Sequence, residues 1–262
     1  MKRIAIIALS VFMALQSISV SAWGPVGHDV VAAIAQQHLT KKAQKEIDKL
    51  LEGKSIVYYS SWMDNIQNSP YWKNGYNATK TWHYANVDKG MTYDSMQKNP
   101  NGDVVTALET LTDAMKNHYK ELTDSMKVDY LKMIVHMVGD MHCPMHAGRS
   151  TDRGGNRVKV LYFNRETNLH SIWDSSLVES AHNWSYSEWQ FQIDRCADAF
   201  VQQVQQGTPE EWFMQTVAIA KKIYFRSSGN TVRRGSSSGQ ERKQRKPSVR
   251  QMSYAGGERK RN

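Results

Sequence analysis

Three histidines and one carboxylate lie within eleven residues of this chain, from His136 to His146. On a helix, His136 and Asp140 would share one face, because residues four apart are neighbours on a helix surface. Pro144 disfavours a continuing helix, so we expect His146 to return from a loop. One helical face and one returning loop could bring several ligands to a metal ion. A helix with buried, hydrogen-bonded histidines is the alternative, and it fits a single histidine better than this cluster.

Further histidines and aspartates of the chain could join this cluster. His170 and Asp174, for example, are again four residues apart. The complete candidate set is His28, Asp64, His83, His136, Asp140, His146, His170 and Asp174. A catalytic zinc takes about three protein ligands and a water, so this set exceeds the needs of one ion. It suits a multi-metal site of the kind that hydrolyses phosphate esters, and histidine with aspartate favours Zn²⁺.

The charge of such a site would favour an anionic substrate. Three zinc ions carry more positive charge than three aspartates cancel, so the site would attract a phosphodiester. The histidines outside the set are expected to have structural or supporting roles: His38, His118, His142 and His182.

Helices are expected to position most of these side chains. Apolar residues recur at helical spacing after Asp103, and Thr40 and Thr208 are good N-caps for two more helices. The expected helices are 30–39, 41–51, 104–119, one from 125 or 126 into the His136 cluster, 187–206 and 209–224, with residues 168–174 also helical.

The segments between these helices are loops and one hairpin. Residues 68–80 and 91–102 are polar and rich in turn formers, and residues 82–86 are either a short extended piece or an ordered loop. Val158, Val160 and Tyr162 alternate with polar residues, which predicts a small hairpin. The predicted fold class is therefore mainly α with one small β-hairpin.

The formal net charge of +9 does not describe the body of the chain. From residue 226 onward, eleven basic side chains stand against two acidic ones, so residues 1–225 are neutral. Residues 226–262 have no apolar periodicity, and such a segment cannot bury enough surface to offset its ordering entropy. We predict a disordered basic tail there, with a basic arm for nucleic acid or a membrane as the alternative.

The first 22 residues are typical of a secretory signal peptide. Two basic residues precede a short apolar run at residues 4–15, which is too short to span a bilayer. Cleavage after Ala22 would leave Trp23 first, with an uncleaved membrane anchor as the alternative. No other segment is long and apolar enough to span, so we expect an exported protein, periplasmic or secreted. In an oxidising compartment Cys143 and Cys196 could pair or remain two thiols.

Six motifs, in their order and spacing, resemble the zinc-dependent single-strand-specific nucleases of the S1/P1 type. They are Trp23-x4-His28, Trp-Met-Asp64, Trp-His83-Tyr, His136-x3-Asp140-x5-His146, Asp-Arg-Gly-Gly-Asn156 and Asn-Leu-His170-x3-Asp174. The resemblance covers residues 23 to about 225, the predicted nuclease domain. It implies a mostly helical fold related to bacterial zinc phospholipase C, with three zinc ions in a cleft.

The resemblance also implies a ligand set for each zinc ion. One ion would be held by Asp64, His83, His136 and Asp140, and a second by His146, His170 and Asp174. The third would take the α-amino nitrogen and carbonyl oxygen of Trp23 together with His28, and would share Asp140 as a bridge. Because that amine exists only after cleavage behind Ala22, the precursor should lack a complete site.

The activity implied by the resemblance is hydrolysis of single-stranded DNA and RNA to 5′-nucleotides, together with cleavage of 3′-nucleotides. Zinc would generate the attacking nucleophile from water near neutral pH and offset charge on the leaving oxygen. Asp140 and Asp64 are the carboxylates expected to carry catalysis. No stable protein partner is implied.

Four further residues are expected at the substrate. By resemblance Tyr84 would stack on a base and Asn86 would hydrogen-bond its edge, which would favour single strands. Tyr84 could instead serve only in packing. Asn156 and Asn168 are expected to orient ligands or substrate.

The chain departs from the family pattern at Gln67, where many relatives carry a basic residue near the scissile phosphate. Arg149, Arg153 or Lys159 could compensate. Two other functions remain open: a zinc-dependent phospholipase C, and a zinc-binding protein without catalysis. The short spacing from Trp23 to His28 favours the nuclease over the phospholipase, as does an aspartate at residue 174 where the phospholipases have glutamate.

Overall fold

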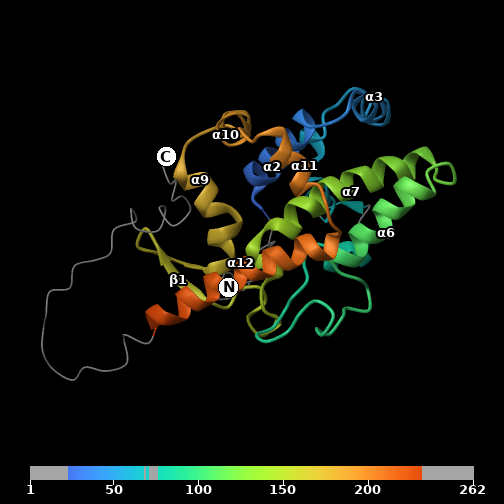
Figure 1. Ribbon diagram of the computed structural model, residues 1–262. Coiled ribbons are helices and arrows are strands. Elements are labelled where there is room, and N and C mark those ends of the chain that lie inside the picture. The colour runs from blue at the N-terminus through green and yellow to red at the C-terminus, as the bar shows by residue number, and fades with distance from the viewer. Residues whose placement is uncertain (1–22, 68, 71–75, 232–262) are drawn as a thin grey trace, which may run out of the picture. The chain divides into compact units, whose positions relative to one another are not determined.

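The computed structural model describes residues 23–67, 69–70 and 76–231 (Figure 1). The chain divides into two compact units, residues 1–223 and 224–262. Within the described ranges helices dominate and one two-stranded sheet accompanies them, which confirms the predicted mainly α class. The predicted signal peptide and most of the predicted tail lie outside the described residues.

The regular elements of the described residues are α2 (Pro25–Gln37), α3 (Lys41–Leu50), η2 (Val57–Tyr59), α4 (Trp62–Ile66), η3 (Tyr76–Thr81), α6 (Val104–Asn117), α7 (Asp124–His142), η4 (Pro144–Ala147), η5 (Ser150–Asp152), β1 (Lys159–Tyr162), β2 (Arg165–Asn168), α8 (Leu169–Ser171), η6 (Ile172–Ser176), α9 (Leu177–Ala181), α10 (Tyr186–Ile193), α11 (Asp198–Val204) and α12 (Pro209–Thr231). No helix among these is both long and apolar enough to cross a membrane.

Side-chain caps fix where the main helices begin. The Thr40 hydroxyl accepts a hydrogen bond from the Ala43 amide at 3.1 Å and starts α3, as predicted. Asp103 starts α6, also as predicted, through a capping box with Thr106. Helix α7 begins at Asp124 because Thr123 is its N-cap, one or two residues earlier than the sequence suggested.

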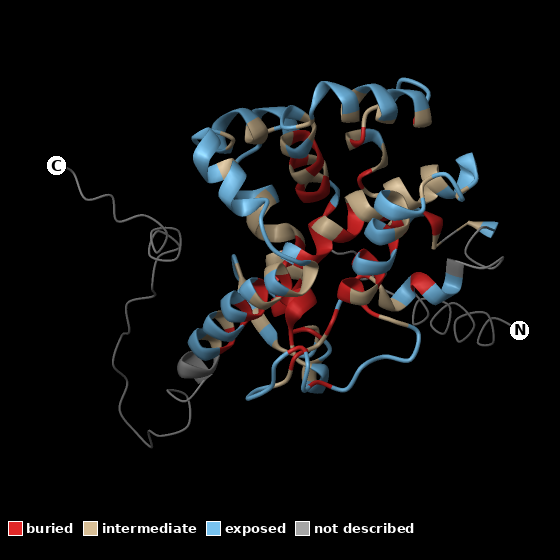
Figure 2. Ribbon diagram, turned by 45° about the vertical axis from the view of Figure 1, so that its right-hand side comes forward, coloured by how far each residue is buried: buried red, intermediate tan, exposed pale blue. Residues whose placement is uncertain are grey.

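The main core forms where α6 and α7 lie side by side and the first part of α12 packs against them (Figure 1). Leu108 of α6, Met137 of α7 and Phe213 of α12 are all fully or almost fully buried in it. Figure 2 shows such buried residues gathered on the inner faces of the helices, with exposed faces outside. Because α7 is held along its length by this core, the ligand candidates on it have a rigid support.

The predicted hairpin is present. Strand β1 pairs with β2 antiparallel, with Lys159 opposite Asn168 and Tyr162 opposite Arg165. Phe163 and Asn164 form the turn with φ of 46° and 64°, the positive values that a tight two-residue hairpin requires. Asn168 ends the hairpin and accepts a hydrogen bond from the Ser171 amide, so β2 leads directly into the turn that carries His170.

Two expectations about the C-terminal half are wrong in detail. The predicted helix 187–206 is two helices, α10 and α11, because Asp194 leaves the helical conformation and its carboxylate lies 2.8 Å from the His38 ring at the end of α2. Helix α12 runs on to Thr231, so residues 226–231, which were predicted to be disordered, are helical.

Residues 82–86 form an ordered loop, whose Ala85 amide donates to the His146 carbonyl at 3.0 Å.

Candidate metal centre

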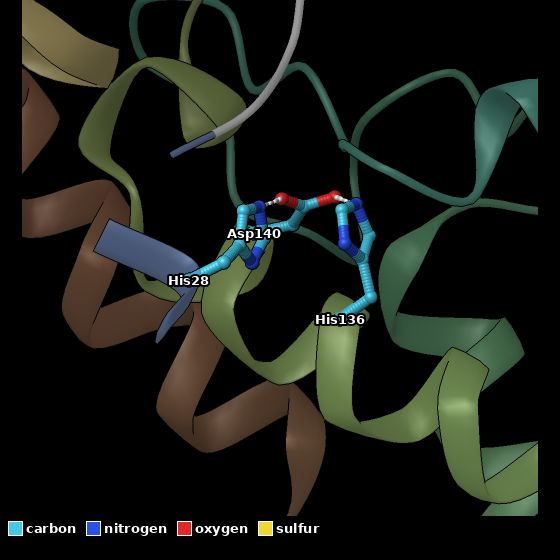
Figure 3. A group of neighbouring side chains, drawn as sticks. All are labelled: His28, His136 and Asp140. Atoms are coloured by element: carbon cyan, nitrogen blue, oxygen red, sulfur yellow. Dashed lines mark ion pairs between the residues drawn. The ribbon is translucent and has the colours of Figure 1, made fainter. Parts of the chain in front are cut away.

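Asp140 lies at the centre of the predicted cluster and is completely buried. Figure 3 shows His28 and His136 on opposite sides of its carboxylate. His28 Nε2 from α2 lies 3.1 Å from Asp140 Oδ1, and His136 Nε2 lies 3.2 Å from Oδ2. The predicted helical spacing of four residues therefore places His136 and Asp140 together, while α2 brings His28 from more than a hundred residues away.

A second pair of side chains closes on the same carboxylate. His83 Nδ1, from the loop after η3, lies 2.9 Å from Asp140 Oδ2 and 3.1 Å from His136 Nε2. Asp64 Oδ1, from α4, lies 3.7 Å from both ring nitrogens. Asp64, His83 and His136 offer ligand atoms within 4.8 Å of one another, as do His28, His136 and Asp140.

A third group gathers around His146. His146 arrives on the 3₁₀ turn η4 rather than on an irregular loop, because Pro144 ends α7 and begins this turn. Its Nε2 lies 3.8 Å from Asp174 Oδ1, and its ring centroid lies 5.1 Å from that of His170. Asp174 occupies the π-helical turn η6, and such turns are frequent at functional sites.

Backbone carbonyls orient three of these imidazoles. His136 Nδ1 lies 2.7 Å from the Ser60 carbonyl, His146 Nδ1 lies 2.6 Å from the His83 carbonyl, and His170 Nδ1 lies 2.7 Å from the Gly154 carbonyl. A carbonyl can only accept, so each Nδ1 carries a hydrogen, and Nε2 is the nitrogen of each ring that can face a metal. Metal-ligating histidines show this pattern, because the second ring nitrogen fixes the tautomer and the orientation.

The lone pairs left over fit a bound cation. Three buried imidazole nitrogens have no hydrogen-bond partner among the described residues: His83 Nε2, His146 Nε2 and His170 Nε2. Buried polar atoms left unpaired cost about 1–3 kcal/mol each, so native proteins rarely retain several at one place. Imidazole nitrogens are among the donors that zinc prefers.

The pKa values of His136 and Asp174 also indicate that the cluster is suited to binding cations. Burial lowers the pKa of His136, but the Asp140 and Asp64 carboxylates outweigh it and raise this pKa to about 9. Burial raises the pKa of Asp174 to about 10, with the Asp140 and Asp64 carboxylates adding to the effect. Without metal, protons would therefore take the place of cations among these carboxylates.

Three other imidazoles, those of His28, His146 and His170, stay neutral and able to act as ligands. Burial lowers the pKa of His146 to about 3, and burial also lowers the pKa of His170 and, together with the neighbouring His136, that of His28. Burial opposes ionisation of Asp140, but His136 and His146 outweigh it and hold the pKa of this carboxyl well below its usual range. Neutral imidazoles and an ionised carboxylate are the forms that bind a metal.

Trp23, the predicted terminal ligand, lies beside this centre. The amide of the next residue, Gly24, donates to the Asp174 carbonyl at 2.7 Å. A Cβ added at Gly27 would meet the Trp23 ring at 2.9 Å, so the indole packs on the first turn of α2. The start of the described chain is thus held close to both Asp174 and His28.

The predicted substrate residues divide into two groups. Tyr84 is 37 % exposed and Asn86 is half-buried in the loop that follows His83. The side chains of Asn156 and Asn168 are already engaged with backbone, Asn156 with the Arg153 carbonyl at 2.9 Å and Asn168 with the Ser171 amide. The latter two therefore hold the turns around Gly154 and His170, and substrate contact by any of the four remains a prediction.

Two residues for which the sequence predicted no role in the metal centre, Gly139 and Cys143, matter for its geometry. Gly139 lies against His28, since a Cβ there would come within 2.8 Å of its Nδ1. A lone glycine inside a helical pattern was the available signal. Cys143 is buried with its sulfur 3.7 Å from Asp174 Oδ1, whereas Cys196 is exposed, and neither is in a disulfide.

Comparison with known proteins gives an independent line of evidence. The sequence model of the S1/P1 nuclease family matches residues 23–259. Endonuclease 3 of Arabidopsis thaliana is 31 % identical over 173 residues, covering 63 % of this chain and 58 % of that protein. Endonuclease 2 of the same plant is 27 % identical over 192 residues (68 % and 64 %), and nuclease S1 of Aspergillus oryzae is 28 % identical over 168 residues (61 % and 55 %). The chain thus spans less than two thirds of the length of these relatives.

Proposed function

Because this chain belongs to the S1/P1 nuclease family, we propose that it is a zinc-dependent endonuclease and 3′-nucleotidase that hydrolyses single-stranded DNA and RNA to 5′-nucleotides. The observation that carries the proposal is the Asp140 carboxylate, whose two oxygens face different histidines inside a completely buried cluster. The names of the relatives, nuclease and endonuclease, support the same reaction class.

The proposal assigns three zinc ions to this cluster. The ligand sets are Asp64, His83, His136 and Asp140 for the first ion, His146, His170 and Asp174 for the second, and the Trp23 main chain with His28 and Asp140 for the third. The donor groups within 4.8 Å of one another support the first set and the His28–Asp140 half of the third. The unpaired Nε2 atoms of His146 and His170 support the second.

Bound zinc would supply a nucleophile from water near neutral pH and a positive charge for the oxygen that leaves. The protein's part is to fix geometry. Asp140 would be shared by two of the ligand sets, because its two oxygens face different histidines, and Asp64 would add a second carboxylate to the first set. Burial disfavours the charged forms of His28, His146 and His170, so these three imidazoles keep their lone pairs for metal.

Substrate selection is assigned to the loop after His83. Tyr84 offers a partly exposed ring for stacking on a base, and stacking of this kind contributes about 1–3 kcal/mol per base. Inside a duplex the faces of a base are covered by the neighbouring base pairs, so this contact favours single strands. Asn86 would hydrogen-bond the edge of the stacked base, and a positive metal cluster would attract its phosphate.

The proposal includes export, with cleavage after Ala22 to create the amine of Trp23. The packing of Trp23 against Gly27 and the bond from Gly24 to Asp174 support a first residue held at the centre. The other expected functions, a phospholipase C and a zinc-binding protein without catalysis, would share these ligands and differ only in turnover.

One experiment separates these functions. Purified mature protein is offered heat-denatured DNA, duplex DNA, RNA, 3′-AMP and phosphatidylcholine, each with and without a chelator and with zinc added back. We expect chelator-sensitive cleavage of the single strands and of 3′-AMP, with duplex DNA cut more slowly. Turnover of lipid without nucleotide release would overturn the nuclease proposal, and a zinc-loaded protein without any turnover would indicate a binding protein.

A further inference from the structure

Cys143 is completely buried at the point where α7 ends and the turn η4 begins. Its amide donates to the Asp140 carbonyl at 2.9 Å and closes the last turn of the helix that carries His136 and Asp140. Its side chain contacts a distant part of the chain: the sulfur lies 3.7 Å from Oδ1 of Asp174, 31 residues further on. One residue thus joins the helix of the first ligand set to a carboxylate of the second.

The chemistry at this contact is that of a donor facing an acceptor. A thiol has one hydrogen to donate, and the Asp174 carboxyl group, which would be ionised when it holds a zinc ion, could then only accept. Asp174 is itself buried, and the same oxygen, Oδ1, lies 3.8 Å from His146 Nε2. A hydrogen bond from sulfur to this oxygen limits rotation of the carboxyl group about its terminal torsion, which is otherwise broad.

We propose that Cys143 is a positioning residue, whose thiol donates to Asp174 and fixes the carboxylate in the orientation that receives the second zinc ion beside His146. The inference rests on the proposed zinc site of His146, His170 and Asp174. It adds to that site a sulfur that hydrogen-bonds to the metal ligand Asp174 but does not itself bind the zinc ion. Groups that hold ligands in this way typically change metal affinity about 10–100-fold when they are removed.

Direct ligation by sulfur is the competing arrangement, because Cys143, His146 and Asp174 offer atoms within 4.8 Å of one another. The geometry favours the donor role. His170 Nε2 is buried and unpaired, so it completes a three-residue set with His146 and Asp174 without the sulfur.

The test measures zinc affinity rather than activity. Mature protein with Cys143→Ala or Cys143→Ser is titrated against a chromophoric chelator that competes for zinc, beside the unaltered protein. We expect Cys143→Ala to hold one of its zinc ions about tenfold or more weaker, and Cys143→Ser to stay within a few-fold of the unaltered protein, because a hydroxyl also donates. Val105→Ala, a truncation at a completely buried position of α6, is the control for packing: it should lower the melting temperature without changing zinc affinity.

Two outcomes would overturn the inference, and a third would remove the zinc site on which it rests. Equal zinc affinity of Cys143→Ala and the unaltered protein would remove the positioning role. A thiolate-to-metal charge-transfer band in the cobalt-substituted protein, lost in Cys143→Ser, would make the sulfur a ligand instead. Absence of zinc from the unaltered protein would overturn the proposed function, and that result is read from a separate metal analysis before any variant is compared.

Discussion

Gly139 lies directly against the imidazole of His28, so closely that a Cβ at residue 139 would stand 2.8 Å from Nδ1 and 3.1 Å from Cε1 of that ring. Contacts this short between a Cβ and a ring do not occur without a shift. The missing side chain therefore allows α2 to bring His28 to within 3.1 Å of Asp140, the residue next to Gly139.

Gly139→Ala separates helix stability from site geometry. Alanine in a helix interior is about 0.5–1 kcal/mol more favourable than glycine, so α7 itself should gain. The imidazole of His28 should move, and we expect loss of the third zinc ion in metal analysis and at least a tenfold loss of nuclease activity.

The control for Gly139→Ala is a double-mutant cycle with His28→Ala. If the glycine acts only through the imidazole, adding Gly139→Ala to His28→Ala should cause no further loss of zinc or activity. A further loss of either would assign Gly139 a different role.

Asp140→Asn tests the bridging carboxylate. Asparagine keeps the shape but loses the negative charge and one acceptor oxygen, so it cannot bind two cations. We expect activity to fall about 100-fold or more. Metal analysis should show the loss of at least one zinc ion per molecule. Retained activity with a single missing ion would contradict the bridge. Asp113→Asn, at an exposed carboxylate of α6, is the matched control and should change neither quantity.

Extra residues before Trp23 should leave the third zinc site incomplete, because a peptide bond replaces the amine. We expect mature protein beginning at Trp23 to carry one more zinc ion than protein that begins with Gly-Ser-Trp23, and to be the more active of the two. Removing the two added residues with an aminopeptidase should restore the ion. Equal zinc content in both forms would argue against the terminal amine as a ligand.

Asp103→Ala should weaken the fold without touching the metal centre. Asp103 Oδ1 accepts the Val105 and Thr106 amides at 3.0 and 3.1 Å, and the buried Tyr93 hydroxyl donates to it at 2.8 Å. Loss of an N-cap costs about 0.5–2 kcal/mol, and the stranded hydroxyl adds about 1–3 kcal/mol. Urea unfolding should report this loss with zinc content unchanged. In the Tyr93→Phe background, where no hydroxyl can be stranded, the cost should fall to that of the cap.

The metal-free protein should lose stability in acid through its buried neutral histidines. Burial lowers the pKa of His146 from an ordinary 6.5 to about 3. Between these values the unfolded chain binds a proton at His146 that the folded chain does not. The free energy of unfolding therefore falls as the pH drops from about 6.5 toward 3. Above that range His146 does not change the free energy of unfolding with pH. His146→Gln removes this titration, and its apo form should show a shallower loss of stability between pH 7 and 4. An equal slope would show that His146 does not contribute.

Much of the local structure could be predicted from the sequence, because it depends on neighbours in the chain. Thr40 and Asp103 cap helices through amides two or three residues away, and the hairpin follows from strand alternation and a two-residue turn. His136 and Asp140 share a face because helix geometry fixes that relation. The ligand types alone also favoured zinc.

The tertiary structure decided everything that depends on packing between distant segments. It brought His28, Asp64 and His83 to Asp140, pulled Asp194 out of a helix toward His38, and extended α12 past residue 226. It also placed two residues that no spacing rule marks: Gly139, whose value is the side chain that it lacks, and Cys143, whose thiol reaches Asp174. Sequence periodicity reports which face a residue occupies, whereas close approach depends on how two elements cross, and that is set by the whole core.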